Sequence, residues 1–284
     1  MRSTRIRTRT FGRGGPSITS VGLGGEGVLR TYGRAEDARA VIQEAVEQGI
    51  TYFDSARAYA GSQEYYGTIW SRLPGIRKEI FQASKSASRD RAGALADLED
   101  TLAKMGIEHL DLWQIHDVRT DRELEEIAGP GGSLEAFLEA KASGRVRFIG
   151  VTGHHDPAIL TRAVKEWPLD SVMMPVNPAE GALGGFLDTT LPLAREKGMA
   201  VIGMKILGQS HYIDPEGGLT PDLLIRYALS QGIDVAIVGC STPGEVQTLA
   251  RIGRDSPPME EEEQRILVDA FRPHARRLAF YRGV

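Results

Sequence analysis

The chain has 284 residues, of which 41% are hydrophobic and 25% charged, and its formal net charge of −4 at pH 7 gives no reason to expect nucleic acid as a partner. No apolar run approaches the roughly 18 residues that a membrane-spanning helix needs, and the basic N-terminus lacks the apolar segment of a signal peptide. The single cysteine, Cys240, excludes an intramolecular disulfide and a multi-cysteine metal site, so we expect a cytoplasmic protein that needs no metal.

The first predicted element is a β-hairpin within residues 4–20. Its side chains alternate on both sides of Gly14-Gly15, a turn sequence. Short β-rich runs then alternate with amphipathic stretches along the rest of the chain, a pattern typical of a parallel sheet. These predicted strands cover residues 18–24, 50–54, 79–85, 110–116, 146–152, 171–177, 200–205 and 234–239.

The stretches between these strands have helical periodicity. In the first, apolar residues from Ala38 to Ala45 recur at helical spacing, and Gly49 stands where a C-terminal cap belongs. Three later helices are predicted to begin at a capping residue followed by proline, which loses no hydrogen bond in the first turn. These pairs are Asp156-Pro157, Thr220-Pro221 and Thr242-Pro243.

Eight strand–helix units in a chain of this length match a (β/α)8 TIM barrel, and an open doubly wound sheet is the structural alternative. We expect residues 1–284 to form a single barrel domain whose N-terminal β-hairpin closes the bottom. The acidic run Glu260–Glu263 is expected to open an extra C-terminal helix, because carboxylates favour a helix N-terminus.

Ionisable residues end three successive predicted strands: Asp54, Lys85 and His116, each 31 residues from the next. Side chains at the carboxyl ends of barrel strands converge at one mouth, where catalysis takes place. Tyr59 follows Asp54 by five residues, in a loop that could bring its phenol to the same mouth. We therefore expect these four side chains to form a catalytic group.

Each member of this group has a chemical role in the reduction of a carbonyl. The oxygen that becomes negative needs a proton donor, and a phenol with a pKa of about 10 is a poor acid at neutral pH. We expect Lys85 to lower the pKa of Tyr59 and Asp54 to hold the lysine charged. His116 would donate a hydrogen bond to the substrate oxygen.

The segments around these residues resemble signatures of the aldo-keto reductase family, from about Val21 to the last strand and its helix. The similar segments are Tyr52-Phe53-Asp54-Ser55-Ala56 with Tyr59, Gln82-Ala83-Ser84-Lys85, and Asp111-Leu112-Trp113-Gln114-Ile115-His116. The family's catalytic Asp, Tyr, Lys and His fall on Asp54, Tyr59, Lys85 and His116. The resemblance implies a barrel oxidoreductase that reduces a small carbonyl substrate with NAD(P)H.

The family binds its cofactor without a Rossmann fold, which bears on Gly22-Leu23-Gly24-Gly25-Glu26-Gly27. This run matches the dinucleotide fingerprint, but a fingerprint should open a helix directly, and here the helix is predicted to begin only near Arg34. We interpret these glycines instead as letting the backbone approach the nicotinamide end of the cofactor.

The resemblance also implies the other cofactor contacts. Thr152 would bind the carboxamide, and Gly153 replaces an asparagine partner whose contact Asn177 would supply. Glu245 stands where NADPH-preferring members often carry arginine, so NADH stays open. NADPH is expected only because the family commonly uses it. The expected cofactor-binding residues are Gly24, Gly25, Thr152, Gly153, Asn177, Met204, Lys205, Leu207, Gly208, Gly239, Ser241 and Thr242.

Two other functions fit parts of the sequence. Lys85 and Lys205 at strand ends also suit a Schiff-base aldolase, in which a lysine attacks a carbonyl. A barrel of this family could instead bind cofactor without catalysis and act as a regulatory subunit. The substrate and the oligomeric state are not indicated by the sequence.

Overall fold

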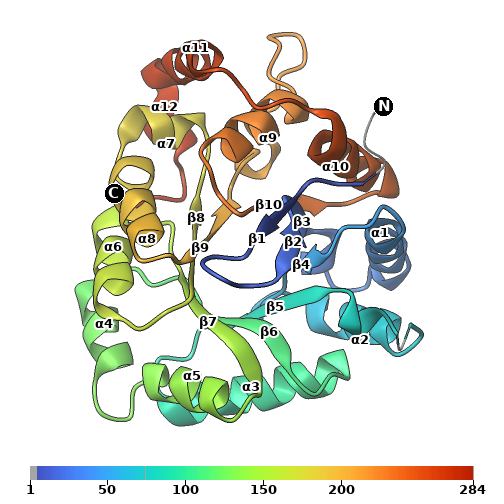
Figure 1. Ribbon diagram of the computed structural model, residues 1–284, viewed down its shortest axis with the longest axis vertical. Helices are drawn as coiled ribbons and strands as arrows, with labels where there is room; N and C mark the ends of the chain where they lie inside the picture. Colours follow the sequence, from blue (N-terminus) through green and yellow to red (C-terminus); the bar gives the residue numbers. More distant parts are fainter. Residues whose placement is uncertain (1–4, 74, 284) are drawn as a thin grey trace.

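The computed structural model describes residues 5–73 and 75–283, and its centre is a closed barrel of parallel strands (Figure 1). The barrel follows chain order and closes where the last strand pairs with the first, which confirms the predicted (β/α)8 fold and excludes the open sheet. The barrel strands are β3 (Val21–Gly27), β4 (Tyr52–Phe53), β5 (Phe81–Ser86), β6 (Leu110–Ile115), β7 (Val146–Thr152), β8 (Ser171–Pro175), β9 (Ala200–Met204) and β10 (Val235–Cys240).

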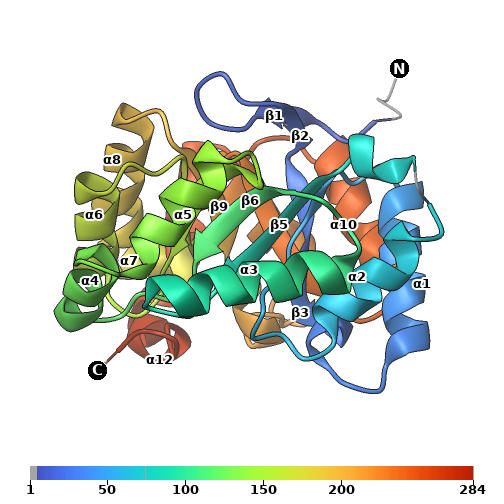
Figure 2. The same ribbon diagram turned by 90° about the horizontal axis from the view of Figure 1, so that it is seen from below.

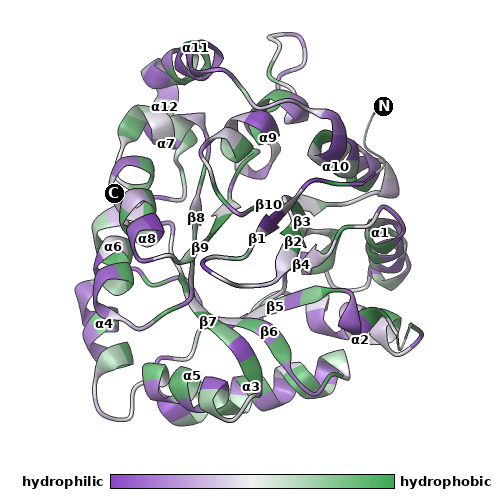
Figure 3. Ribbon diagram, viewed as in Figure 1, coloured by the Kyte–Doolittle hydropathy of each residue, from purple (hydrophilic) through white to green (hydrophobic). Residues whose placement is uncertain are grey.

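Helices surround the barrel (Figure 1), and hydrophobic and hydrophilic stretches alternate along them (Figure 3). Their buried apolar residues belong to one cluster with apolar residues of the strands. The N-caps predicted at Asp156, Thr220 and Thr242 are confirmed, since each side chain accepts a hydrogen bond from the first turn of its helix. The helices are α1 (Ala35–Glu47), α2 (Ser62–Trp70), α3 (Arg91–Met105), α4 (Asp121–Ala128), α5 (Ser133–Ala142), α6 (Pro157–Glu166), α7 (Pro178–Leu183), α8 (Leu191–Glu196), α9 (Pro221–Ser230), α10 (Pro243–Asp255), α11 (Glu261–Phe271) and α12 (Ala275–Leu278). No helix within residues 5–73 and 75–283 is long and apolar enough to cross a membrane.

The extra C-terminal helix is α11, and it begins with a capping box between Glu260 and Glu263. The dinucleotide-like glycine run lies inside β3 and is followed by a 3-10 turn, η1 (Val28–Arg30), before α1 starts at Ala35. The run therefore does not open a helix, and the prediction that it is not a Rossmann fingerprint is confirmed.

The predicted N-terminal hairpin consists of the antiparallel strands β1 (Thr8–Thr10) and β2 (Ser17–Thr19). The predicted strand 18–24 was wrong in its extent, because its first residues belong to β2 and the barrel strand starts at Val21. Phe11, at the hairpin turn, packs inside the barrel, with its ring centroid 4.7 Å from that of Phe81 and 5.3 Å from that of Phe148. The hairpin thus closes one end of the barrel, and α12 lies at the other (Figure 2).

Alternation along the strands separates two hydrophobic clusters, one inside the barrel and one between the barrel and its helices. In β6, Leu112 belongs to the inner cluster, whereas Trp113 faces outward and stacks on Phe137 of α5 at 3.7 Å between ring centroids. In β5, Phe81 and Ala83 are in the inner cluster. Lys85, two residues further on, therefore also points inward, at the end of the barrel opposite the hairpin.

Candidate active site

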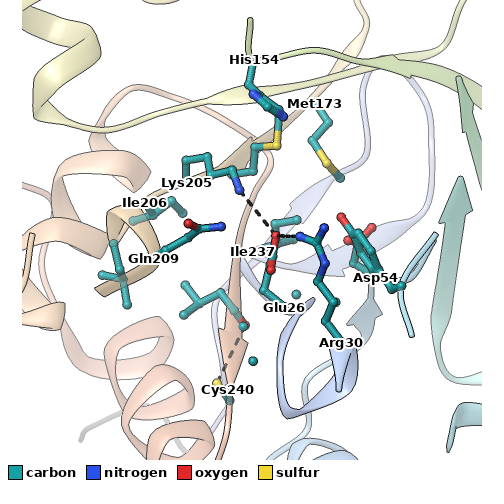
Figure 4. A pocket seen from close by; sticks show the side chains of 18 of the residues that line it. Glu26, Arg30, Asp54, His154, Met173, Lys205, Ile206, Gln209, Ile237 and Cys240 are labelled. Carbon is teal, nitrogen blue, oxygen red and sulfur yellow. Dashed lines mark hydrogen bonds and ion pairs between the residues drawn. The ribbon is translucent and has the colours of Figure 1, made fainter. Parts of the chain in front are cut away.

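A cavity of about 1260 Å³ opens at the carboxyl ends of the barrel strands. Asp54, Tyr59, Lys85 and His116 all line it, although they come from three successive strand–helix units. The loop after β6, the segment after β9 and the C-terminal tail also contribute to the walls, with Asp117, Gln209 and Phe280 among other residues. Figure 4 shows part of this lining.

Lys85 and Asp54 form a buried ion pair at the base of this cavity. The Lys85 ammonium donates to the Asp54 carboxylate at 2.6 Å and to the backbone oxygen of Ser55 at 2.8 Å, and both side chains are 1% exposed. Burial lowers the pKa of Lys85 because it disfavours the charged form, and the Asp54 carboxylate opposes this shift. The second carboxylate oxygen of Asp54 is buried without a partner among the described residues.

Tyr59 lies above this ion pair, with the Lys85 nitrogen 4.9 Å from its ring centroid. The His116 ring meets it edge to face, with 5.7 Å between the centroids. The phenol ring packs against the backbone of Gly25, where a Cβ atom would come within 2.5 Å of the ring. A side chain at position 25 would therefore displace Tyr59, which explains the need for glycine at this position of β3.

The electrostatics differ from the expectation for Tyr59. Burial raises the pKa of its phenol well above the ordinary value, and the carboxylates of Asp54 and Glu26 raise it further. The prediction that this pKa is lowered was therefore wrong: desolvation outweighs the nearby ammonium. Burial, with the charge of Lys85, also lowers the pKa of His116 to about 3, so this imidazole is neutral at physiological pH.

The structure brings nine of the twelve expected cofactor-binding residues to the cavity. Gly153, Asn177 and Gly208 do not line it. Gly153 packs against Leu160 and the backbone of Val118. The nine lining residues are Gly24, Gly25, Thr152, Met204, Lys205, Leu207, Gly239, Ser241 and Thr242.

Asn177 is fully buried and its amide has structural partners. Its oxygen caps α7 at the backbone nitrogen of Glu180, and its nitrogen donates to the backbone oxygen of Lys205 at 3.0 Å and to the Tyr281 hydroxyl at 2.8 Å. This side chain therefore joins the loop after β9 to the C-terminal tail.

The rim of the cavity holds strained backbone. Among the described residues other than glycine, a positive φ occurs at Asp117, Lys205, Gln209 and Ser210, and all four line the cavity. Such conformations cost on the order of 1–3 kcal/mol each and gather at functional sites. Their confinement to this rim supports the cavity as the site of function.

The N-terminus of α10 already has a carboxylate of the protein itself beside it. The Glu245 carboxylate accepts from the backbone nitrogen of Ser241 at 2.6 Å, and the Thr242 hydroxyl accepts from the backbone nitrogen of Glu245. A carboxylate thus lies beside Ser241 and Thr242, two of the expected cofactor-binding residues.

Three charged groups across the cavity were not recognised as a unit from the sequence. Glu26 accepts from Arg30 at 2.9 Å and lies 3.4 Å from the Lys205 ammonium, so it joins the loops after β3 and β9 (Figure 4). The spacing of Glu26 and Arg30 was a readable signal, but Lys205 is 179 residues away from Glu26.

His154 connects two walls of the cavity. One ring nitrogen lies 3.3 Å from the Asp117 carboxylate and the other 3.1 Å from the backbone oxygen of Tyr281. Within the described part of the chain, no three His, Cys, Asp or Glu side chains are arranged to hold a metal ion.

Sequence comparison gives one family. The Aldo/keto reductase family model matches residues 20–213. L-galactose dehydrogenase of Arabidopsis thaliana is 25% identical over an alignment of 315 residues, gaps included, that covers 92% of this chain and 94% of the relative. An aldo-keto reductase of Schizosaccharomyces pombe, named with NADP(+), is 29% identical over 188 residues, covering 61% of this chain and 53% of that protein.

Solved structures share the fold. The holo form of an aldo-keto reductase from Bacillus halodurans has a TM-score of 0.75 at 20% identity, with 96% of each chain covered. An aldo-keto reductase from Klebsiella pneumoniae in complex with NADPH has a TM-score of 0.74 at 19% identity, with 94% of this chain and 95% of that chain covered.

Proposed function

Because this chain belongs to the Aldo/keto reductase family of oxidoreductases, we propose that it reduces an aldehyde or ketone to an alcohol with NAD(P)H, and that Tyr59 donates the proton. The observation that carries this proposal is the convergence of Asp54, Tyr59, Lys85 and His116 at one cavity. Acid, neighbouring cation and neutral hydrogen-bond donor lie together there, as the reduction of a carbonyl requires.

The pKa shifts bear on these roles. The raised pKa keeps the Tyr59 phenol protonated at neutral pH, so it holds the proton that the carbonyl oxygen must receive, but it also makes the phenol a weaker acid. His116 is neutral, and its N–H can donate a hydrogen bond to the same oxygen without competing as an acid. The Lys85 ammonium, paired with Asp54, stabilises the phenolate that is left when the proton departs.

Two features of the cavity wall support the binding of a dinucleotide. β3 and β10 approach so closely that a Cβ atom at Gly24 would lie 2.9 Å from the backbone nitrogen of Gly239, which leaves bare backbone on that wall. The Thr152 hydroxyl accepts from the Asp117 backbone nitrogen at 2.8 Å and keeps its own proton to donate. When bound, the nicotinamide supplies the hydride, and Thr152 and Met204 are the residues that we propose to hold its ring.

For the cofactor we propose NADPH, with NADH as the alternative. NADPH is supported by the names of relatives, which include NADP(+) and NADPH. NADH is favoured by Glu245, whose carboxylate at the start of α10 would repel a 2′-phosphate. The two cofactors therefore differ in the charge that favours their binding at the N-terminus of α10.

The test is Tyr59→Phe, assayed by reduction of 4-nitrobenzaldehyde with NADPH. We expect a loss of at least about 100-fold in kcat, because a positioned proton donor contributes that much. NADPH binding, measured by protein fluorescence, should change little. Tyr32→Phe is the matched control, since Tyr32 is 76% exposed and lies outside the cavity lining.

Full turnover in Tyr59→Phe would remove Tyr59 as the proton donor. Covalent trapping of the aldehyde on Lys85 or Lys205 by borohydride would favour the aldolase instead. Cofactor binding by the unsubstituted protein, with no turnover across a panel of aldehydes and ketones, would favour the non-catalytic subunit.

A further inference from the structure

Two cations, not one, lie against the ring of Tyr59. The Lys85 nitrogen is 4.9 Å from the ring centroid, and the central guanidinium carbon of Arg30 is 5.1 Å from it. Both distances are within the range of cation–π contacts. Lys85 is supplied by β5 and Arg30 by the turn after β3, so the two charges reach the phenol from different elements.

The position of Arg30 is fixed by its surroundings. Val28 and Leu29, which precede it in η1, are buried and anchor the turn. The guanidinium donates to the Glu26 carboxylate at 2.9 Å, and Glu26 in turn lies 3.4 Å from Lys205 (Figure 4). Because Glu26 binds the guanidinium from one side, Arg30 is held over the ring although its side chain is 48% exposed.

We propose that Arg30 is a positioning residue for the Tyr59 phenol. The Arg30 guanidinium stabilises the phenolate that forms when the phenol gives up its proton. This inference rests on the proposed role of Tyr59 as proton donor. It adds that the reactivity of the phenol is set by the opposed charges of Arg30 and Glu26 and not by Lys85 alone.

The charged groups that face Tyr59 come from several elements of the barrel mouth. Arg30 favours the phenolate and lowers the pKa of Tyr59, while Asp54, Glu26 and Asp117 raise it. Lys85 lies over the ring, and His116, at its edge, is neutral. Removing Arg30 or Glu26 should therefore move the ionisation of the phenol in opposite directions.

The reverse reaction reports this ionisation directly. When 4-nitrobenzyl alcohol is oxidised with NADP+, its hydroxyl proton passes to the Tyr59 phenolate and its hydride to NADP+, giving 4-nitrobenzaldehyde and NADPH. Below the phenol's pKa, the rate rises tenfold per pH unit because it follows the phenolate fraction. Arg30→Met, which keeps the apolar stem, should shift the rising part of the pH–rate profile to higher pH by about one unit. Glu26→Gln should shift it to lower pH.

Two further variants separate charge from shape. Arg30→Lys retains the charge and should restore most of the rate that Arg30→Met loses. Arg34→Met is the matched control: Arg34 pairs with Asp37, is exposed and lies outside the cavity lining, so its pH profile should match the wild type. Profiles for Arg30→Met and Glu26→Gln that coincide with the wild type, or that shift in the same direction, would overturn the proposal.

A measurement without cofactor or turnover keeps this inference distinct from the proposed function. In protein labelled with 13C at the tyrosine Cζ, the Tyr59 signal is assigned by its loss in Tyr59→Phe. In Glu26→Gln the Tyr59 signal should begin to titrate at lower pH than in the wild type. The additional substitution Arg30→Met should reverse that change. Absence of both effects would reject the role of Arg30, whereas activity in Tyr59→Phe would reject only the proton donor.

Discussion

The Lys85 ammonium and the Asp54 carboxylate lie 2.6 Å apart and are almost fully buried, at the ends of neighbouring barrel strands. Burial removes both charges from bulk solvent, so each depends on the other. The pair therefore contributes to stability and, through the lysine's position beside Tyr59, to the proposed chemistry. These two contributions can be separated by mutation.

Lys85→Met should abolish carbonyl reduction and lower the free energy of unfolding by about 3–5 kcal/mol, because it leaves the Asp54 carboxylate buried without a partner. Urea unfolding and the reduction assay measure the two effects. Adding Asp54→Asn removes the unpaired charge and should recover much of the stability while activity stays lost. Substantial turnover in either variant would show that the lysine is not required.

The lowered pKa of His116 predicts that the stability of the folded protein depends on pH. Its pKa is about 3 in the folded protein and about 6.5 when unfolded, so between these values the unfolded chain binds more protons. Stability therefore rises with pH across this window and is lost as pH falls from about 6.5 towards 3.

In His116→Gln this loss should be smaller, so the urea midpoint should fall less between pH 7 and pH 4.5 than in the wild type. His274→Gln, at an exposed histidine, is the control and should behave like the wild type. Equal falls for His116→Gln and the wild type would indicate that the imidazole is not desolvated as the structure has it.

The fold was readable from the sequence because barrel strands and amphipathic helices carry local periodic patterns. The strand-end residues were readable for the same reason, since Asp54, Lys85 and His116 recur once per unit. The electrostatics were not, because the pKa of Tyr59 depends on burial and on Glu26 and not on its sequence neighbours alone.

Contacts between distant loops were equally hidden. Asn177 was expected at the cofactor, yet its amide joins Lys205 to Tyr281, a residue 104 positions away. No local pattern encodes such a pairing. The barrel brings these segments together, and only the assembled structure shows which polar groups are already satisfied.

Glu245→Arg tests the cofactor preference. If the N-terminus of α10 meets the adenosine ribose, replacing the carboxylate by a guanidinium should raise the ratio of kcat/KM for NADPH over NADH by about tenfold or more, through a charge-assisted contact to the 2′-phosphate. Glu261→Arg makes the same charge change at the first turn of α11 and should leave the ratio unaltered. An unchanged ratio in Glu245→Arg would place the ribose elsewhere.

The C-terminal tail should depend on the pair between Arg282 and Glu180. Glu180 is fully buried, accepts from the Tyr281 hydroxyl at 2.9 Å and from the Arg282 Nε at 3.1 Å, and so holds the tail against α7. Because Phe280 and Tyr281 line the cavity, Arg282→Met should raise the KM for a carbonyl substrate and increase cleavage of the tail by carboxypeptidase.

The stability change in Arg282→Met has a predicted pH dependence. Burial raises the pKa of Glu180 even with its partner present, and removing the guanidinium raises it further. The folded variant then binds more protons than its unfolded chain, so its stability falls as pH rises. Its deficit relative to the wild type should therefore be larger at pH 8 than at pH 5. Arg277→Met, at an exposed position of α12, should show no such trend. A deficit independent of pH would mean that Arg282 acts through packing and not through the charge of Glu180.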